Sequence, residues 1–175
     1  MRHIKLAIIT IMALTLFAGA AAAQKKTVKK TTPVKKPPVA VVPPLDVRAG
    51  REKVDNQLSN VNDYLNKLGP IAANLETAIA DKNANKLKPA TAKKVEEAQQ
   101  QLIKSLQDLK IGLTALESEF RTKSALQKYL PSLQGITNLA AQAEDSAVAA
   151  KFVAAKEPLR NVGLKLTDTL NVMPR

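Results

Sequence analysis

A regular spacing of apolar residues over residues 89–123 is the feature that most limits what this chain can fold into. Apolar side chains recur in steps of three, four or seven residues, and only Gln99 interrupts the series. This spacing is typical of an α-helix that packs against other helices. At roughly 1.5 Å per residue the helix is about 50 Å long, so its one-sided apolar face needs partner helices. The positions are Val95, Leu102, Leu106, Leu109, Leu113, Leu116 and Phe120.

The same spacing is found upstream, in residues 45–82. From Val54 onward apolar residues follow in alternating steps of four and three, and the register continues beyond Gly69-Pro70. A register that survives Pro70 predicts one long helix with a kink there, because proline removes a hydrogen bond and clashes with the preceding turn. Two helices that meet at this Gly-Pro pair are the competing interpretation. Residues 81–89 are expected to form a loop.

Two further helices are predicted in the C-terminal third of the chain. Ser124 and Gln127 have the spacing of a capping box, in which a hydroxyl and an amide satisfy free N–H groups at a helix start. This pair is expected to open a helix over residues 125–145. The register slips by one residue near the end of that helix, where Asp145 or Ser146 is a suitable N-cap for the last helix.

These segments predict an all-α fold, an antiparallel up-down helical bundle with short loops. Three long helices, the third of them broken, are the alternative. No segment alternates with a period of two residues, so no sheet is expected. Apart from the Gly69-Pro70 pair, each helix carries one glycine, which we interpret as a point of close helix approach rather than as space for a ligand. The four principal helices are expected at residues 45–82, 89–122, 125–145 and 147–171, and their glycines are Gly50, Gly112, Gly135 and Gly163.

Residues 1–23 have the pattern of a bacterial secretory signal peptide. Arg2 and Lys5 supply a positive start, an apolar run over residues 6–17 follows, and three alanines at 21–23 provide small residues for signal peptidase. We expect cleavage after the third alanine and export to the periplasm or the extracellular space. An uncleaved N-terminal membrane anchor is the alternative.

Residues 24–44 form a basic linker, QKKTVKKTTPVKKPPVAVVPP, with six lysines, five prolines and no acidic or aromatic residue. Unopposed lysines without a core-forming face predict disorder, and the prolines stiffen the segment toward an extended polyproline geometry. The bundle domain that follows, residues 45–175, holds 19 basic and 15 acidic residues, so the positive charge is concentrated in the linker. Its candidate contacts for an anionic surface are Lys25, Lys26, Lys29, Lys30, Lys35 and Lys36.

Three interpretations of the basic linker compete. It is a charged spacer, or an electrostatic tether to an anionic cell-envelope polymer or membrane surface, or a nonspecific nucleic-acid binder. Each lysine near an anionic surface contributes about 1 kcal/mol at best, so six lysines give salt-sensitive attachment. The Lys/Pro/Thr composition resembles that of linker-histone tails, but the chain lacks the clustered aromatic residues and arginines of nucleic-acid recognition. We therefore favour the tether.

The predicted architecture resembles that of small exported haem-carrying bundles of the cytochrome c′ type. The stretch KFVAAKEPLRNVGLKL, residues 151–166, is similar to the terminal helix of those proteins. This resemblance implies a haem cofactor, but the haem ligands are missing. The chain has no cysteine, its only histidine is His3, and its only methionine after the signal peptide is Met173. We expect no haem and no other cofactor.

The absence of histidine and cysteine after the signal peptide also excludes other kinds of site. Zinc sites with histidine or cysteine ligands cannot form, and no Gly-rich phosphate loop or serine-nucleophile motif is present. A chain with neither histidine nor cysteine in its folded domain is an unusual enzyme, so we expect no catalytic residue and no metal site. The carboxylates expected on solvated outer faces of the helices are Glu96, Glu97, Glu117 and Glu119.

The sequence therefore predicts an exported, non-enzymatic structural or adaptor protein of the periplasm or cell envelope. The basic linker supplies electrostatic attachment, and the helix faces supply a protein partner surface or self-association. The alternative is a periplasmic ligand-binding or chaperone-like bundle that uses a groove between helices. A large exposed apolar stripe favours that alternative, whereas a closed core favours the scaffold.

Overall fold

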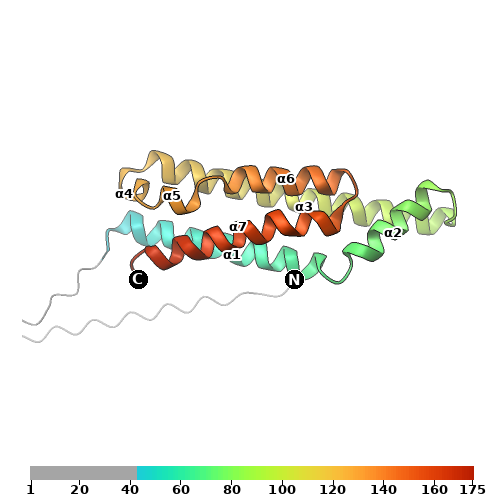
Figure 1. Cartoon of the computed structure of the whole chain (residues 1–175), viewed down its shortest axis with the longest axis horizontal. Helices are drawn as coiled ribbons and strands as arrows, with labels where there is room; N and C mark the ends of the chain where they lie inside the picture. The colour runs from blue at the N-terminus through green and yellow to red at the C-terminus, as the bar shows by residue number, and fades with distance from the viewer. Residues whose placement is uncertain (1–42) are drawn as a thin grey trace, which may run out of the picture. The chain divides into compact units, whose positions relative to one another are not determined.

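The computed structural model describes residues 43–175, and the regular secondary structure of this part of the chain is helical (Figure 1). The predicted all-α class is confirmed for these residues. The predictions for the signal peptide and for residues 24–42 of the basic linker lie outside them. The helices are α1 (Leu45–Leu68), α2 (Ala72–Asn83), α3 (Pro89–Thr122), α4 (Ser124–Gln127), α5 (Leu130–Leu133), α6 (Ile136–Val148) and α7 (Phe152–Val172).

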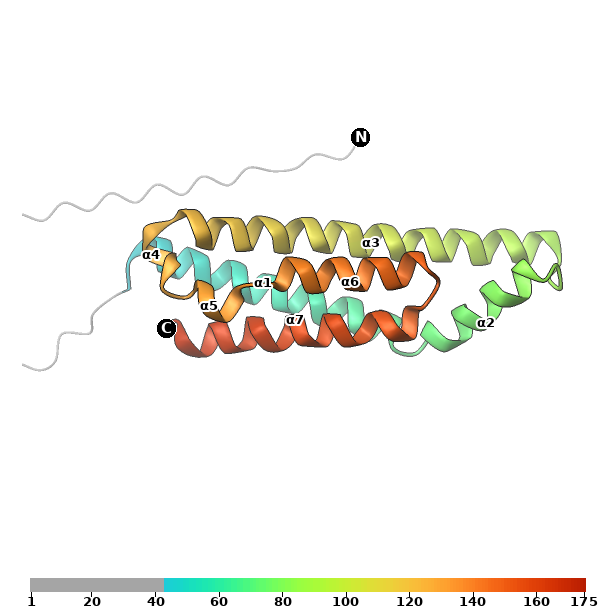
Figure 2. The ribbon, with the colours of Figure 1, turned by 45° about the horizontal axis from the view of Figure 1, so that its top comes forward.

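Helices α1, α3, α6 and α7 lie side by side in a helical bundle (Figures 1 and 2). Helix α3 packs against α6, α6 against α7, and α7 against α1, and α1 also contacts α3. The short helices α4 and α5 lie at one end of the bundle, where α4 contacts both α1 and α3. At the other end, α2 and the first turns of α3 form a helical hairpin that extends beyond α6 and α7 (Figure 2).

The core follows the predicted apolar register. On α3, Leu106, Leu113 and Phe120 are spaced by seven residues and are fully buried. Helix α6 presents alanines at the core positions 140, 143 and 147, which are fully buried as well. Because alanine is small, α6 can lie close to both α3 and α7. Leucine, valine and phenylalanine from the other helices fill the remaining volume without a polar cluster in the centre.

Helix α3 has the bounds that its sequence predicts. Pro89 occupies the first helical position, where its missing N–H costs nothing, and the helix runs without interruption to Thr122. Lys123 ends the helix because its backbone is extended, with φ −86° and ψ 116°. The long predicted helix with partner helices along it is therefore confirmed.

The chain breaks at Pro70, so the prediction of one kinked helix is wrong. Helix α1 ends at Leu68 and α2 begins at Ala72. The N–H of Gly69 still donates to Leu65 O at 2.8 Å, but Pro70 has no N–H to continue the ladder. The two-helix interpretation holds, and the register survives because the break is only three residues long.

The predicted helix over residues 125–145 is three segments, α4, α5 and α6. Gly135 separates α5 from α6 with φ +91°, a left-handed conformation that side chains with a Cβ rarely adopt. The capping box is absent, because Lys123 precedes α4 and makes no side-chain cap. The amide of Gln127 instead donates to the main-chain oxygen of Arg121 at 3.0 Å, near the end of α3.

The last helix begins later than predicted, at Phe152. Asp145 and Ser146 lie inside α6 and are not its N-cap. The turn between α6 and α7 uses Ala150 with φ 59°. The free N–H of Val153 at the start of α7 donates to Glu76 Oε1 at 2.7 Å, so a side chain of α2 supplies the cap. Helix α7 then continues through its internal proline to Val172.

Between residues 43 and 175, no helix is both long enough and apolar enough to cross a membrane.

Candidate functional site

The six lysines of the predicted site precede residue 43 and therefore lie outside the described residues. A groove with many polar lining residues lies between α1 and α3 and is here called the α1/α3 groove. It consists of two hollows of about 320 and 310 Å³ that share Gln57. Its other lining residues are Lys53, Asn56, Asn60, Asp63, Tyr64, Lys67, Leu102, Ser105, Asp108, Leu109, Gly112, Ala115, Leu116 and Glu119.

Helical spacing explains why these side chains form a groove. On both helices the lining residues recur every three or four positions beside the apolar core positions, so they lie along one edge of each helix. Most of the lining positions on α1 carry amides or charged groups, which do not pack into a dry interface. The apolar positions of α1 and α3 therefore pack together in the core, and the polar residues beside them line a hollow between the two helices.

Tyr64 is one of the residues at the base of the groove. Its ring is buried, with 6% of its surface exposed, and its hydroxyl donates to Leu102 O at 3.2 Å. Burial raises the pKa of Tyr64 to about 12. The phenol is therefore neutral at every physiological pH and acts as a packed hydrogen-bond donor rather than as a general base.

Gln57 and Gly112 face one another at the point where the two hollows meet. A Cβ on Gly112 would lie 2.8 Å from Gln57 Nε2, so glycine makes room for this amide. The Gln57 Oε1 atom is covered by the protein and accepts no hydrogen bond. A buried acceptor without a partner is costly, and a rotation of the Gln57 side chain toward the groove would relieve that cost.

An ion-pair network closes the groove at the end near α4. Glu119 Oε2 lies 2.6 Å from Lys53 Nζ, and Glu119 Oε1 lies 2.7 Å from Lys123 Nζ. The second contact is an ion pair by distance although its geometry is not that of a directed hydrogen bond. The ammonium groups of Lys123 and Lys53 hold the pKa of Glu119 below its ordinary value. The network therefore ties α1 to the end of α3.

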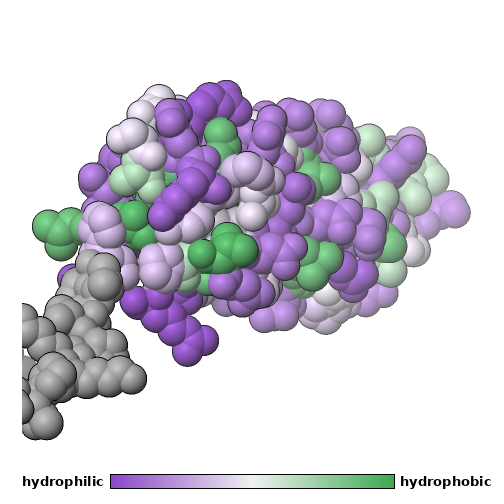
Figure 3. Space-filling model, turned by 60° about the vertical axis from the view of Figure 1, so that its left-hand side comes forward, coloured by the Kyte–Doolittle hydropathy of each residue, from purple (hydrophilic) through white to green (hydrophobic). Residues whose placement is uncertain are grey.

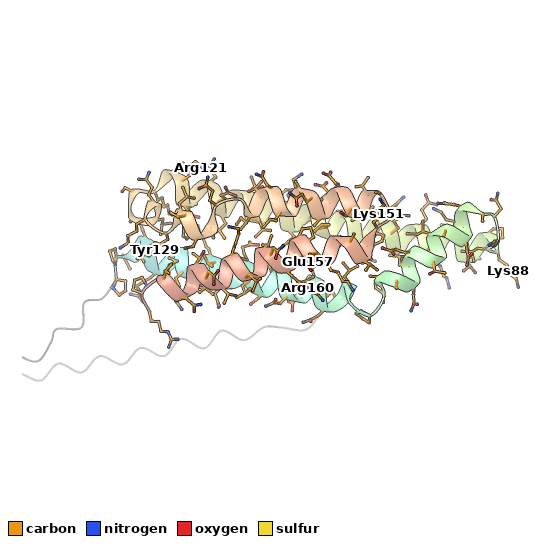
Figure 4. All side chains as sticks on the ribbon, viewed as in Figure 1. Lys88, Arg121, Tyr129, Lys151, Glu157 and Arg160 are labelled. Atoms are coloured by element: carbon orange, nitrogen blue, oxygen red, sulfur yellow. The ribbon has the colours of Figure 1, made fainter. Side chains whose placement is uncertain are left out.

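Glu117 is a buried carboxylate on the opposite edge of α3. It accepts hydrogen bonds from the N–H groups of Gly135 (3.2 Å) and Thr137 (3.1 Å), and Arg121 Nη2 lies 3.1 Å away. Burial alone raises the pKa of Glu117, but these N–H groups and Arg121 outweigh burial and hold the pKa below its ordinary value. The carboxylate caps the start of α6, and Arg121 lies at the end of the bundle that holds α4 and α5 (Figure 4).

The groove can bind polar groups, but its nucleophile candidate is not activated. Ser105 Oγ donates its proton to Gln101 O on its own helix at 2.9 Å, whereas an activated serine donates to a base. Within residues 43–175, no group of three or more acidic, histidine or cysteine side chains could hold a metal ion. The arrangement therefore suits hydrogen bonding to a polar ligand.

The exposed apolar residues of the bundle are scattered. Leu45, Ile111, Val148, Leu164 and Val172 are more than half exposed, but they are distributed over four helices, α1, α3, α6 and α7. On the face shown in Figure 3, the apolar patches are separated by polar residues. A shallower hollow of about 400 Å³ between α1 and α7 is lined mainly by apolar surface. The core itself is closed.

Glu117 is buried and Glu119 is half-buried, whereas the sequence predicts solvated positions for both. A signal for Glu117 exists, because it lies four residues after Leu113 and three before Phe120, at the border of the core face. Its partners, however, are backbone N–H groups exposed by the Gly135 turn, which no helical pattern reveals. Gln57 occupies the same kind of border position on α1, between Val54 and Val61.

Comparisons of this chain with protein-family models, with curated proteins and with solved structures found no significant match.

Proposed function

We propose that this chain is an exported, non-enzymatic structural or adaptor protein of the bacterial periplasm or cell envelope. The six lysines of the basic linker attach it electrostatically to an anionic polymer or membrane surface. The bundle, proposed as an antiparallel up-down arrangement of four principal helices, supplies a surface for a protein partner or for self-association. The signal-peptide pattern of residues 1–23 supports export.

The segregation of charge is the observation that carries this proposal. Residues 24–44 hold six lysines and no acidic residue, whereas the bundle domain balances 19 basic with 15 acidic residues. A surface with evenly mixed charges stays solvated. An unopposed run of lysines attracts polyanions, over a distance that becomes shorter as the salt concentration rises. The scattered exposed apolar residues support the scaffold more than a chaperone-like surface.

The test compares binding of two charge variants to isolated cell-envelope material. The first, the tail-neutral variant, replaces the linker lysines at 25, 26, 29, 30, 35 and 36 with glutamine. The matched control removes the same charge from the bundle, at lysines 67, 104, 128, 151, 156 and 165. Sedimentation is measured at low salt and at about 0.5 M salt, where screening confines charge interactions to a few ångströms.

The proposal expects the wild-type chain and the bundle control to sediment at low salt and to be released by high salt. The tail-neutral variant should sediment far less than either of them at low salt. Equal binding of all three proteins contradicts an electrostatic linker and assigns attachment to the bundle. Release of the wild-type chain from the envelope by free DNA at equal phosphate concentration supports the nucleic-acid alternative instead.

A second candidate function is binding of a small polar ligand in the α1/α3 groove. The unpartnered Oε1 of Gln57 favours it, because rotation of this side chain toward the groove would offer the oxygen to a ligand that donates a hydrogen bond. This function belongs to the groove-binding class, and it is independent of the basic linker.

Thermal unfolding in the presence of polar small molecules tests the groove. A ligand that binds only the folded chain raises the melting temperature, and the increase grows with the logarithm of the ligand concentration above Kd. Gln57→Leu should abolish that increase, whereas Gln142→Leu, on the exposed face of α6, should retain it. A ligand whose effect survives Gln57→Leu binds elsewhere and removes the support for the groove.

A further inference from the structure

The positive charge of the bundle is located at one end of it. Residues 82–94, with the sequence KNANKLKPATAKK, hold five lysines and no acidic residue. The rest of the domain over residues 45–175 holds 14 basic and 15 acidic residues, so it is close to neutral. We call the five residues the lysine tip; they are Lys82, Lys86, Lys88, Lys93 and Lys94.

The lysine tip lies at the turn of the helical hairpin. Helix α2 ends at Asn83, the chain reverses with Asn85 at φ 55°, and α3 begins at Pro89. The N–H of Lys86 donates to Asp81 O at 2.9 Å and closes the turn. Figure 4 shows Lys88 at the far end of the hairpin, beyond α6 and α7. The lysines are therefore carried by a folded end of the bundle.

Most of this charge is not neutralised within the described chain. The pair Lys86–Asp81 is separated by 3.7 Å and the pair Lys93–Glu97 by 3.9 Å, and both lysine side chains are at least 70% exposed. Long, exposed ion pairs of this kind contribute little and leave the lysines available. Across residues 43–175, neither Lys88 nor Lys94 has a carboxylate within 4.0 Å. The C-terminus of α2 and the N-terminus of α3 meet here, so their opposite dipoles largely cancel and the lysines dominate.

The position of the charge favours a surface over a strand as partner. A single polymer strand is held best by a groove with cations along it, but the flanks of the helices mix basic and acidic residues. The lysines of the tip instead surround the narrow end of the hairpin, so they can all contact a flat, negatively charged surface when the bundle approaches it end-on. Five lysines without arginine act as mobile point charges, which suit laterally mobile phosphate headgroups rather than fixed bidentate geometry.

We propose that the lysine tip is a docking site for an anionic phospholipid surface, which the bundle contacts end-on. The inference shares with the proposed function the class of anionic partner, but it concerns a different part of the chain. The basic linker joins the bundle at Leu45, at the opposite end of α1 from the hairpin (Figure 1). The molecule then has two cationic ends.

The test uses the full chain in its tail-neutral form, so that the linker does not contribute. Vesicles contain about 30% phosphatidylglycerol in phosphatidylcholine, and binding is measured by co-flotation at low salt. The tip-neutral variant adds glutamine at lysines 82, 86, 88, 93 and 94. The matched control adds glutamine at lysines 67, 104, 151, 156 and 165 instead. Circular dichroism confirms that both variants are folded.

We expect the tail-neutral chain to bind these vesicles and the tip-neutral change to weaken binding at least about tenfold, with the control close to the tail-neutral chain. Equal losses in tip-neutral and control proteins overturn the proposal, because net charge and not the hairpin then decides. No binding by the tail-neutral chain also overturns it. Stronger binding to free polyphosphate than to vesicles overturns it in favour of a soluble polyanion.

The two proposals fail separately in this design. A chain with an intact linker and a neutral tip reports the linker alone, so its binding to envelope material tests the proposed function without the tip. If that chain binds and the tail-neutral chain does not, the proposal for the linker is supported and the proposal for the lysine tip is contradicted. If only the tail-neutral chain binds, the proposal for the lysine tip is supported and the proposal for the linker is contradicted.

Discussion

Glu117 is a single side chain that connects two helices. Its carboxylate belongs to α3 but accepts hydrogen bonds from the backbone at the start of α6, and Arg121 completes its surroundings. Glu117→Gln keeps the shape, removes the charge and turns one acceptor oxygen into an NH₂ group that faces N–H donors. We expect it to lower the free energy of unfolding by about 1 to 3 kcal/mol at neutral pH, measured by urea denaturation.

The effect of Glu117 should depend on pH in a defined direction. Its pKa in the folded chain is lower than the ordinary value of 4.5, so the charged form stabilises the fold fully above that value. This stabilisation is lost as the pH falls through the folded-state pKa. The difference between wild type and Glu117→Gln should therefore shrink between about pH 7 and about pH 3. A constant difference contradicts this role, and Glu96→Gln, on the exposed face of α3, should change little at either pH.

Substitution of Gly135 and of Gly163 by alanine should change the stability of the folded chain in opposite directions. At Gly135 no atom obstructs an added Cβ, but φ +91° strains any other residue, so Gly135→Ala should destabilise by about 1 to 2 kcal/mol. At Gly163, inside α7, an added Cβ meets Leu58 and Val61 at ordinary contact distance, 3.9 Å. Gly163→Ala should therefore stabilise by about 0.5 to 1 kcal/mol. Chemical denaturation of the pair measures both, and equal signs contradict the assigned backbone conformations.

The same elements show what the sequence predicts well and what it does not. Helix α3 was predictable to within a residue because its apolar register has no glycine turn and its proline stands at the first position. The break at Gly135 was not predicted, because the apolar register continues across it. At Pro70 the same continuity favoured one kinked helix over the two helices that the structure contains. The α1/α3 groove was hidden for a related reason, since periodicity locates an apolar face but not the gap between two polar edges.

Within residues 43–175 the core extends along the whole bundle, from Val47 to Met173. Even the C-terminal end is fixed, because Arg51 Nη1 donates to Met173 O at 2.8 Å. A chain that starts at Pro43 should therefore unfold at the same urea concentration, and with the same slope, as the chain that also contains the basic linker. A lower midpoint in the shorter chain means that the linker packs on the bundle.

Two cationic ends predict a behaviour that neither end gives alone. Helix α3 has 34 residues and separates the lysine tip from the Leu45 end by about 50 Å. At low salt the wild-type chain should cluster anionic vesicles, measured by light scattering, and salt should reverse the clustering. The tail-neutral variant and a chain with an intact linker and a neutral tip should each bind without clustering. Undiminished clustering by either variant contradicts a bridge with one contact at each end.

The burial of Tyr64 and Tyr129 has an optical consequence. The chain has no tryptophan and only these two tyrosines, so ultraviolet emission from the folded protein comes from two chromophores. Tyr64 lies in the α1/α3 groove, and Tyr129 lies between α4 and α5 at the end where Arg121 is found (Figure 4). Replacing either tyrosine with phenylalanine leaves one native fluorophore, so the unlabelled protein can report which part of the bundle opens first.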